Sequence, residues 1–307
     1  MYDLIIIGGG PAGIAAGIYA ARKKLKTLLL TESLEGQSSV SPEIQNWIGE
    51  INISGIDLSK KLESHLRSYE SDNFVIKTKE KAISLNPQDK GLTVFSINDT
   101  YQTKTVLIAT GANRRKLSVQ GAAEFEQKGV TYCASCDGPI FAGQKVAIIG
   151  GGNAGFCSAA QLLAYCEKVT LLETASNFKA EQITIDNLIA NPKFKALANV
   201  ELLEIKGDKF VTSLVYRDKE TDKEYELPVT GIFVEIGFIP NTKNFQDLVE
   251  TTTWDAIKID HRTGQTSREG IWAAGDCTDI LYHQNNIAAG DAIKAVEDIY
   301  NYLQKQS

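Results

Sequence analysis

The strongest constraint on the fold of this chain is an internal repeat built around a triple glycine. Residues 3–13 (DLIIIGGGPAG) recur as residues 145–155 (KVAIIGGGNAG). Each copy has an apolar run before the glycines, a small-residue helical pattern after them, and then a second apolar run. The second run ends in an acid, Glu32 or Glu173, about 20 residues beyond the last glycine, as in dinucleotide-binding units. The sequence therefore predicts an α/β protein with two Rossmann-like, three-layer domains of one kind.

The glycines of each copy have separate tasks. The first permits a tight turn, the second lets the backbone approach a pyrophosphate, and the third lets the helix pack closely on the strand. The pyrophosphate is then expected at the helix N-terminus, where unpaired N–H groups and the helix dipole favour negative charge. Pro11 suits this place, because its missing N–H costs nothing in the first helical turn. The expected contacts are Gly8, Gly10, Pro11, Ala12 and Gly13 in the first copy, and Gly150, Gly152, Asn153 and Gly155 in the second.

The acid of each copy is expected to accept hydrogen bonds from a ribose. A carboxylate at this place accepts from a ribose 2′-hydroxyl and repels a 2′-phosphate. The segment that follows Glu173, residues 174–179, contains no arginine for a 2′-phosphate. If the second copy binds a nicotinamide dinucleotide, NADH is therefore favoured over NADPH.

Several shorter patterns surround the repeat. Residues 105–111 and 270–276 each predict a strand that ends in a tight turn, residues 113–117 predict a polar linker, and residues 230–241 predict a strand with an exit loop. The segments 73–103 and 198–227 alternate apolar and polar residues, which predicts two antiparallel layers. Helical periodicity from Ile287 to Gln304 predicts a helix near the C-terminus.

Charge and hydropathy exclude two classes of partner. The 307 residues carry a net charge of −6, and no basic footprint for nucleic acid is visible. Residues 4–21 carry no charge, but the stretch is broken by glycines and Pro11, and it follows Asp3 rather than a basic segment. We therefore expect neither a membrane span nor a secretory signal, and the expected location is the cytoplasm.

One close pair of cysteines, Cys133 and Cys136, stands apart among the five in the chain. Zinc would need four ligands, yet there is no second pair and only three histidines. Two structural thiols are a second interpretation, and a redox-active dithiol is the favoured one. Asp137 follows directly and could exchange a proton with the thiols, or it could simply cap a turn. We expect no metal site, and we expect Cys157, Cys166 and Cys277 to be small buried side chains.

Three further motifs occur in a fixed order with the glycine repeats: ATG at 109–111, CASCDG at 133–138 and AGD at 274–276. The whole set resembles the low-molecular-weight thioredoxin reductases, which have the fold of the FAD/NAD(P)-linked disulfide reductases. The reductase core of the alkyl hydroperoxide reductase flavoprotein is equally similar, and residues 136–141 and 178–180 lean towards it. The resemblance covers essentially the whole chain.

The resemblance implies a homodimer with FAD on the first glycine motif. It implies a discontinuous FAD domain, residues 1–112 and 243–307, and an inserted nicotinamide domain, residues 113–242, that carries the cysteine pair and swivels. Cys136 would face the flavin, and Cys133 would attack the disulfide of a thioredoxin-like or other small dithiol protein. Besides Glu32, the further expected FAD contacts are Gly36, Gln37, Asn46, Ala109, Thr110, Gly111, Gly275, Asp276, His283 and Gln284, and Gly237 is expected at the nicotinamide site.

The chain departs from that family at three places. Cys157 stands where relatives usually have a glutamate near the nicotinamide, the arginines for a 2′-phosphate are absent, and Pro139-Ile140 replaces aromatic residues at the partner surface. Alternatives to NADH are therefore reduced ferredoxin or a reduced flavin. A dithiol oxidase that uses oxygen would have the same fold and thiols. A ferredoxin–NADP reductase would lack the cysteine pair, and a flavin-binding sensor would bind flavin without turnover.

Overall fold

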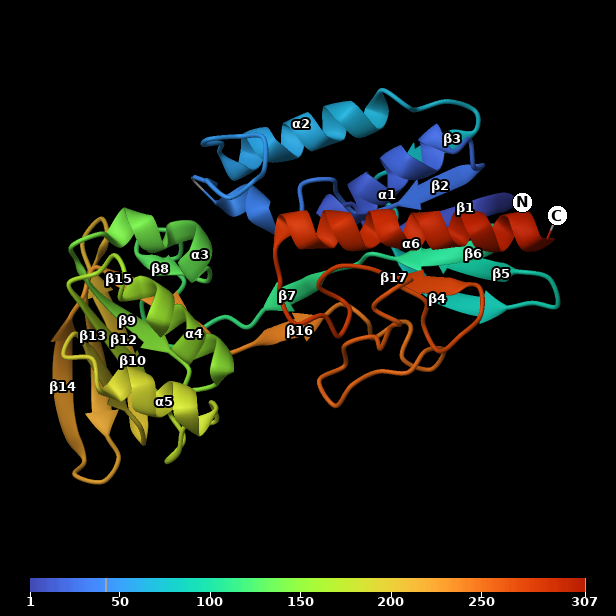
Figure 1. Cartoon of the computed structure of the whole chain (residues 1–307). Coiled ribbons are helices and arrows are strands. Elements are labelled where there is room, and N and C mark those ends of the chain that lie inside the picture. The colour runs from blue at the N-terminus through green and yellow to red at the C-terminus, as the bar shows by residue number, and fades with distance from the viewer. Residues whose placement is uncertain (42, 307) are drawn as a thin grey trace. The chain divides into compact units, whose positions relative to one another are not determined.

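The computed structural model describes residues 1–41 and 43–306, which form two compact units (Figure 1). Unit 1 consists of Met1–Ser41, Trp47–Asn113 and the chain from Ile239 onward. Unit 2 is mainly Arg114–Phe238. Each unit contains one copy of the glycine repeat.

Unit 1 is built on a seven-stranded sheet of order β3-β2-β1-β6-β5-β4, in which β17 also pairs with β6. β3, β2, β1, β6 and β17 are parallel neighbours, and β4, β5 and β6 are antiparallel. The prediction of an antiparallel layer over 73–103 is therefore wrong for β3, which completes a parallel crossover after α2. The strands are β1 (Tyr2–Ile7), β2 (Thr27–Leu30), β3 (Phe74–Lys77), β4 (Ala82–Pro87), β5 (Leu92–Ser96), β6 (Thr100–Ile108) and β17 (Ile271–Ala273).

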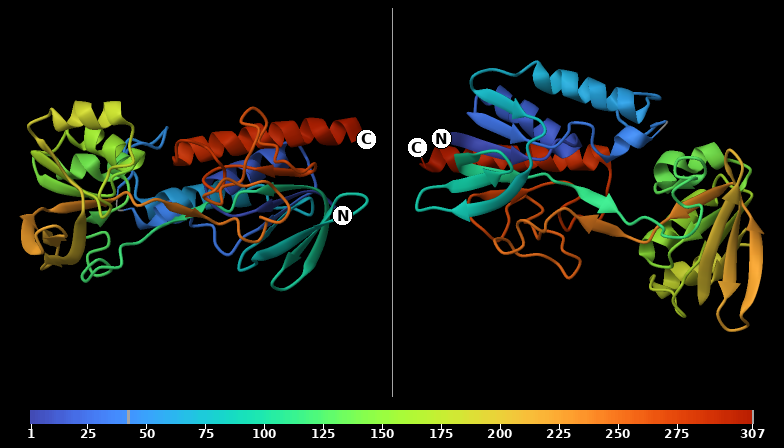
Figure 2. Two further views of the ribbon diagram at one scale, coloured as in Figure 1. Left: turned by 90° about the horizontal axis from the view of Figure 1, so that it is seen from below. Right: turned by 180° about the vertical axis from the view of Figure 1, so that it is seen from behind.

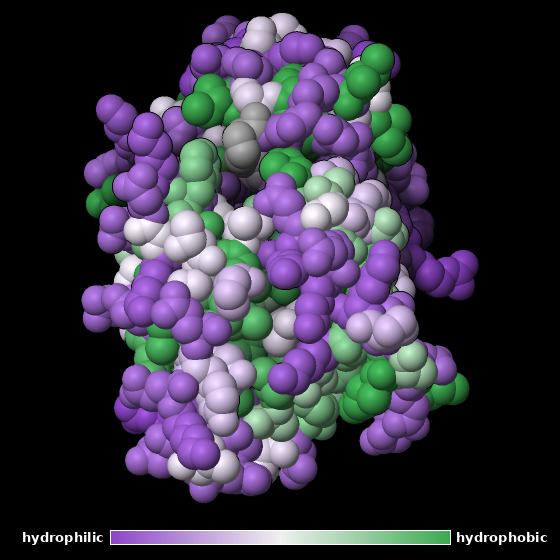
Figure 3. Space-filling view, turned by 90° about the vertical axis from the view of Figure 1, so that its left-hand side faces the viewer, coloured by the Kyte–Doolittle hydropathy of each residue, from purple (hydrophilic) through white to green (hydrophobic). Residues whose placement is uncertain are grey.

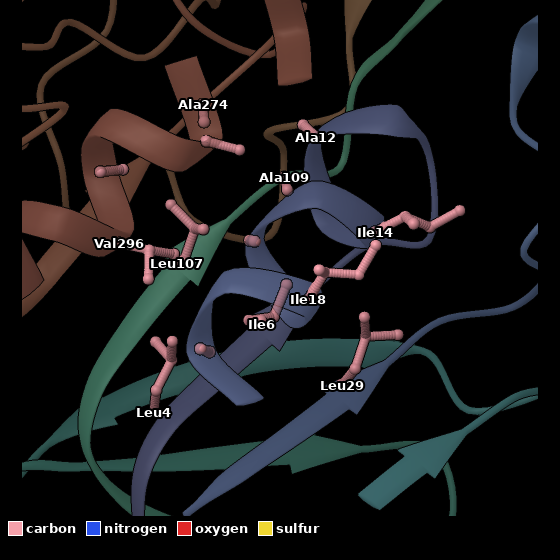
Figure 4. Packing of buried hydrophobic residues seen from close by; sticks show 14 of the residues in the cluster. Leu4, Ile6, Ala12, Ile14, Ile18, Leu29, Leu107, Ala109, Ala274 and Val296 are labelled. Carbon is pink, nitrogen blue, oxygen red and sulfur yellow. The ribbon is translucent and has the colours of Figure 1, made fainter. Parts of the chain in front are cut away.

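Apolar side chains alternate between the two faces of this sheet. Leu4 and Ile6 of β1 belong to the core cluster that helices α1 and α6 cover (Figure 4), whereas Ile5 and Ile7 belong to the cluster on the other face. The views in Figure 2 show the helices on one face and the β4–β5 hairpin with the chain before α6 on the other. The helices are α1 (Pro11–Arg22), α2 (Gly55–Arg67), α6 (Asn285–Gln306) and the 3₁₀ turn η1 (Gln37–Val40). The C-terminal helix is thus confirmed.

Unit 2 is built on a five-stranded parallel sheet of order β11-β10-β9-β15-β8. Val146 and Ile148 of β9 pack under α4 and α5, whereas Ala147 and Ile149 pack against the antiparallel sheet β12-β13-β14. The antiparallel layer predicted over 198–227 is confirmed. The elements are β8 (Val130–Thr131), α3 (Ala134–Asp137), η2 (Gly138–Phe141), β9 (Lys145–Ile149), α4 (Asn153–Leu162), β10 (Lys168–Leu172), α5 (Gln182–Ile189), β11 (Phe194–Leu197), β12 (Val200–Gly207), β13 (Val211–Asp218), β14 (Lys223–Pro228) and β15 (Gly231–Val234).

The two connections between the units are strands that pair with each other. β7 (Ala112–Arg114) and β16 (Phe238–Pro240) form a two-stranded sheet. The Arg115 N–H donates to the Gly237 carbonyl (3.1 Å), and the Asn241 N–H donates to the Gly111 carbonyl (2.9 Å). The polar linker predicted over 113–117 therefore begins as a strand, because a partner segment far along the sequence satisfies its backbone.

Candidate functional site

The two glycine turns have nearly the same geometry. Gly8 and Gly150 have φ of +121° and +119°, and a Cβ there would lie 2.2 and 2.3 Å from the carbonyl oxygens of Ala109 and Glu235. A Cβ at Gly13 or Gly155 would lie 1.9 Å from the carbonyl oxygen of the first glycine in its own copy. These positions accept no side chain, since real contacts are never so short. The predicted tasks of the first and third glycines agree with this packing.

The second glycine of the motif faces open space in both copies. Gly10 and Gly152 precede α1 and α4, and a Cβ at either would have no protein atom within 4 Å. Their φ values of −77° and −90° are accessible to any residue. Glycine is therefore not needed here for the fold of the chain. The empty space at two helix N-termini fits the close approach of a pyrophosphate.

In unit 1 the cradle is formed by segments far apart in the sequence. A Cβ at Gly36 would lie 3.5 Å from the Gly10 Cα and the Pro11 Cδ. A Cβ at Gly275, where φ is +75°, would lie 3.2 Å from the Ala12 Cβ and 3.3 Å from the Ala288 Cβ. The first turns of α1 and α6 therefore meet at Gly275. The predicted residues around the glycine motif and around the AGD motif lie together.

Asp276 is the acid of this AGD turn. Its Oδ1 is buried and has no hydrogen-bond donor among the described residues, although the His283 Nδ1 lies 3.3 Å away. Gln284 comes directly before α6, and its carbonyl accepts from the Ala288 N–H (2.9 Å). A buried carboxylate oxygen without a donor is costly unless a ligand supplies one. The ribityl hydroxyls of FAD are such donors, so the residues of unit 1 fit this cofactor.

Other predicted residues of unit 1 have different surroundings. The Thr110 hydroxyl donates to the Asn241 carbonyl (2.8 Å), so its side chain serves the fold, while Gly111 (φ +65°) borders open space. Glu32 has a side chain that is 66% exposed and pairs with Lys81 (3.0 Å). Gln37 begins η1. Asn46 lies in a short segment grouped with unit 2, so the structure does not bring it to the unit 1 cradle.

In unit 2 the site residues line one edge of the parallel sheet. Because the strands are parallel, the residues that follow β10, β9, β15 and β8 lie at the same edge, in that order. These residues are Glu173, Gly150, Glu235 and the segment that leads to Cys133. The acid, the glycine turn and the cysteine pair are therefore brought to one edge, as the carboxyl end of an α/β sheet requires for a binding site.

The Glu173 carboxylate is bonded to its own loop. Its Oε2 accepts from the Gly151 N–H (2.5 Å), and its Oε1 accepts from the Ala175 N–H (2.8 Å). Asn153 Oδ1 likewise accepts from the Glu181 N–H (2.9 Å). These bonds hold the carboxylate beside the glycine turn. Each carboxylate oxygen has a further lone pair with which it can accept from a ribose hydroxyl.

Cys133 and Cys136 are joined in a disulfide, with their Cα atoms 5.3 Å apart. Cys133 caps the short helix α3, and its Sγ accepts from the Cys136 N–H (3.2 Å). A hydrogen bond of this kind stabilises a thiolate more than a thiol. When the pair is reduced, Cys133 is therefore the better thiolate of the two by this contact.

Asp137 is buried directly behind the disulfide. Its Oδ2 accepts from the Thr131 hydroxyl, and its Oδ1 has no hydrogen-bond donor among the described residues. Burial raises the pKa of the Asp137 carboxyl above its usual range, although the Thr131 hydroxyl and the Arg114 guanidinium act in the opposite direction. Burial at this place is more than a surface cap would show, and a raised pKa suits a group that gains and loses a proton.

The remaining cysteines divide into two kinds. Cys166 and Cys277 are buried, and burial raises the pKa of each thiol to about 11. Cys157 is exposed on α4, so the prediction that it is buried is wrong. It lies in the first turns of the helix, just beyond the residues that form the cradle, where side chains face solvent.

Glu235 is a candidate that sequence reasoning missed. It comes directly after the apolar strand β15, which is the same pattern of an acid after an apolar run that singled out Glu32 and Glu173. Its carboxylate accepts from the Ser158 hydroxyl (2.6 Å). Gly237 follows with φ of +97° and open space around its missing Cβ.

Two searches bear on other kinds of site. Within residues 1–41 and 43–306, no helix is long and apolar enough to cross a membrane. In the same part of the chain, no group of three or more His, Cys, Asp or Glu side chains is arranged to hold a metal ion.

Comparisons with curated proteins give matches over the full length of this chain. A "NADH dehydrogenase" of Bacillus subtilis is 37% identical over 302 residues, which are 98% of this chain and 58% of that protein. The flavoprotein component of an alkyl hydroperoxide reductase of Pseudomonas aeruginosa is 38% identical over 308 residues, which cover 100% of this chain and 59% of that protein. The chain thus spans less than three fifths of the length of these relatives.

Comparison with solved structures agrees with the fold described above. A thioredoxin reductase from Streptococcus pyogenes superposes with a TM-score of 0.90 at 31% identity, and one from Giardia duodenalis with 0.91 at 30%; each match covers 99% of both chains. These matches confirm the predicted resemblance and the predicted fold class. The family model described as pyridine nucleotide-disulphide oxidoreductase matches residues 2–296. The chain belongs to the pyridine nucleotide-disulphide oxidoreductase family, a family of enzymes with a thioredoxin reductase-like fold.

Proposed function

We propose that this chain is an FAD-dependent disulfide reductase that takes electrons from NADH and passes them through Cys133 and Cys136 to a small dithiol protein. One observation carries the proposal. A single sheet edge in unit 2 bears a glycine cradle with its ribose-type acid, and also a disulfide with a buried carboxyl behind it. Unit 1 bears a second cradle of the same geometry.

The two units divide the cofactors. Unit 1 would hold FAD, with the pyrophosphate at the first turn of α1 and the ribityl hydroxyls at Asp276. Unit 2 would hold the nicotinamide dinucleotide at Gly152. Bound FAD supplies the two-electron exchange that links a hydride donor to a disulfide. The cradle and the disulfide of unit 2 lie on one edge and must serve the same flavin in turn, which supports the expectation that unit 2 swivels.

The thiol chemistry follows from the contacts of the cysteine pair. In the reduced form, the Cys133 thiolate, held by the Cys136 N–H, attacks one sulfur of the partner's disulfide. A Cys133–partner bond forms, and the other partner sulfur leaves and takes a proton. The Cys136 thiolate then attacks Cys133, restores the disulfide of this chain and releases the second partner thiol. Asp137, with its raised pKa, is placed to exchange the proton of the pair.

NADH is the proposed donor. Glu173 is fixed beside the glycine turn by two backbone N–H groups, where it repels a 2′-phosphate. No arginine lies between residues 174 and 179. The printed name of the Bacillus subtilis relative, NADH dehydrogenase, points in the same direction.

The proposed partner is a thioredoxin-like or peroxiredoxin-type protein with its own cysteine pair. The names of the relatives, thioredoxin reductase and alkyl hydroperoxide reductase, support this class. Figure 3 shows a face of the molecule that is mainly hydrophilic, with small separate apolar groups. Such a surface suits a brief encounter better than a permanent complex. We also propose that the chain forms a homodimer, by its likeness to the thioredoxin reductases.

Serine substitutions of the cysteines test the thiol assignment. Cys136→Ser is expected to keep FAD, to lose reduction of an oxidised thioredoxin, and to accumulate a mixed disulfide between Cys133 and that protein. Cys133→Ser is expected to lose both reduction and the mixed disulfide. Cys157→Ser, which changes an exposed thiol outside the pair, is the matched control and should keep the parent rate. Reduction by Cys136→Ser at the parent rate would refute the assignment.

A further inference from the structure

Glu235 is the one acid at the binding edge of unit 2, among the described residues, that neither the adenosine contact nor the disulfide chemistry uses. Its backbone is fixed against the glycine turn. The Glu235 N–H donates to the Ile149 carbonyl (2.8 Å), and its own carbonyl lies 2.3 Å from where a Gly150 Cβ would be. The residue therefore cannot move without moving the cradle.

The side chain of Glu235 is held over the helix that forms the cradle. Its Oε1 accepts from the hydroxyl of Ser158, which lies on α4 one turn beyond Gly155. Burial raises the pKa of Glu235 above its usual range, although the Ser158 hydroxyl and the Arg114 guanidinium act in the opposite direction. The residue is only partly buried, so a ligand can still reach the carboxyl. A carboxyl held in this way costs stability that the fold itself does not require.

The order of the strands places Glu235 on the side of the turn opposite Glu173. β9, which carries the glycine turn, lies between β10 and β15. Neighbouring strands are about 4.8 Å apart, so the two acids flank the turn at roughly one strand spacing each. The strand order reverses between β9 and β15, which is where a dinucleotide crosses the sheet. If Glu173 binds the adenosine ribose and Gly152 the pyrophosphate, the other half of the ligand extends over β15.

We infer that Glu235, positioned by Ser158, binds the nicotinamide riboside half of the donor by accepting a hydrogen bond from it. This inference rests on the proposed function, because it needs a nicotinamide dinucleotide in unit 2. Glu173 and Glu235 then divide the ligand, one acid to each half. Ser158 is a positioning residue that acts through Glu235.

Two ligands separate the halves. ADP carries the adenosine and the diphosphate but no nicotinamide riboside, whereas NAD⁺ carries both halves and does not reduce the flavin. Both are titrated calorimetrically into the FAD-loaded protein. Glu235→Ala is expected to raise the Kd for NAD⁺ roughly tenfold and to leave the Kd for ADP unchanged, since one hydrogen bond to a charged group is lost. Glu173→Ala, the matched control at the other acid, is expected to weaken both ligands.

Ser158→Ala tests the positioning role. It should weaken NAD⁺ in the parent but have no added effect in Glu235→Ala, because the two residues act through one contact. An unchanged ADP affinity in each variant shows that the cradle is folded, and a Glu235→Gln variant should recover part of the NAD⁺ affinity through its amide oxygen.

The outcomes distinguish this inference from the proposed donor. A parent that binds NAD⁺, with a Glu235→Ala variant that binds it equally well, would overturn the role of Glu235 and leave the donor intact. Equal loss of ADP and NAD⁺ in Glu235→Ala would also overturn it, since the residue would then support only the cradle. A parent that binds ADP but no NAD⁺ would refute the proposed donor and this inference with it.

Discussion

Replacement of Gly152 by alanine should remove dinucleotide binding from unit 2 and leave the fold intact. The backbone at Gly152 has φ of −90°, and an added methyl group would meet no protein atom within 4 Å. Alanine is a poorer helix N-cap than glycine by about 0.5–1 kcal/mol. It also stabilises by about 0.4–1 kcal/mol through the lower entropy of the unfolded chain. The two effects offset each other, so the expected change in the free energy of unfolding is near zero.

The effect of Gly152→Ala on binding should be large. The methyl group occupies the space through which a pyrophosphate reaches the N-terminal N–H groups of α4. Loss of a single hydrogen bond to the charged diphosphate costs about 1.5–3 kcal/mol, which raises the Kd roughly 10- to 150-fold. Calorimetric titration with NAD⁺ measures this value, and thermal unfolding measures stability on the same sample.

Two further alanines serve as controls for Gly152→Ala. Gly10→Ala, its counterpart in unit 1, should impair retention of FAD and spare NAD⁺. Gly155→Ala should instead destabilise unit 2 by about 1–3 kcal/mol, since its Cβ would lie 1.9 Å from the Gly150 carbonyl and α4 must move. Binding of NAD⁺ by Gly152→Ala with the parent Kd would refute the reasoning, and so would global unfolding of that variant.

Three other predictions concern single side chains. Glu173→Ala should narrow the preference for NADH over NADPH in steady-state kinetics, and an unchanged ratio would remove Glu173 from the ribose site. Because burial raises the pKa of Asp137 in the folded state, its contribution to stability is present at low pH and is lost as pH rises through the folded pKa; Asp137→Asn should therefore gain stability relative to the parent between pH 4 and pH 7 in urea unfolding, and parallel pH profiles would contradict this. Phe156→Ala, which empties a fully buried site against Phe178 and Phe194, should destabilise unit 2 by about 3–5 kcal/mol while FAD stays bound, and loss of FAD would place the damage elsewhere.

The fold was predictable wherever the chain repeats a local pattern. The two strand–glycine–helix–strand units and the C-terminal helix depend on contacts within some 30 residues, and the structure has them where the sequence places them. β3 was not predictable as a parallel strand, because its alternation of buried residues is the same in either direction and only its pairing with β2 decides. The pairing of β7 with β16 likewise depends on segments more than 120 residues apart.

The candidate site was predictable by residue type and less so by contact. The glycines of both turns could be named from spacing, but the bonds of Glu173 to its own loop could not, since a backbone N–H has no sequence signature. Cys157 was expected inside the molecule because an isolated cysteine usually is, yet α4 presents it to solvent. Glu235 escaped notice because β15 is not followed by a glycine turn of its own, although the acid after an apolar strand was visible.

The central claim is that electrons pass from NADH through flavin to the Cys133–Cys136 disulfide. The most direct test is an anaerobic titration of the FAD-loaded protein with NADH, and separately with NADPH, in which the oxidised-flavin absorbance is followed. The parent, with a flavin and a disulfide to reduce, should consume about two equivalents of NADH before full bleaching, and Cys136→Ser about one, since each is a two-electron couple. NADPH should bleach neither at matched concentration. If neither nucleotide bleaches a flavin that dithionite reduces, or if parent and variant consume equal amounts of NADH, the account is wrong.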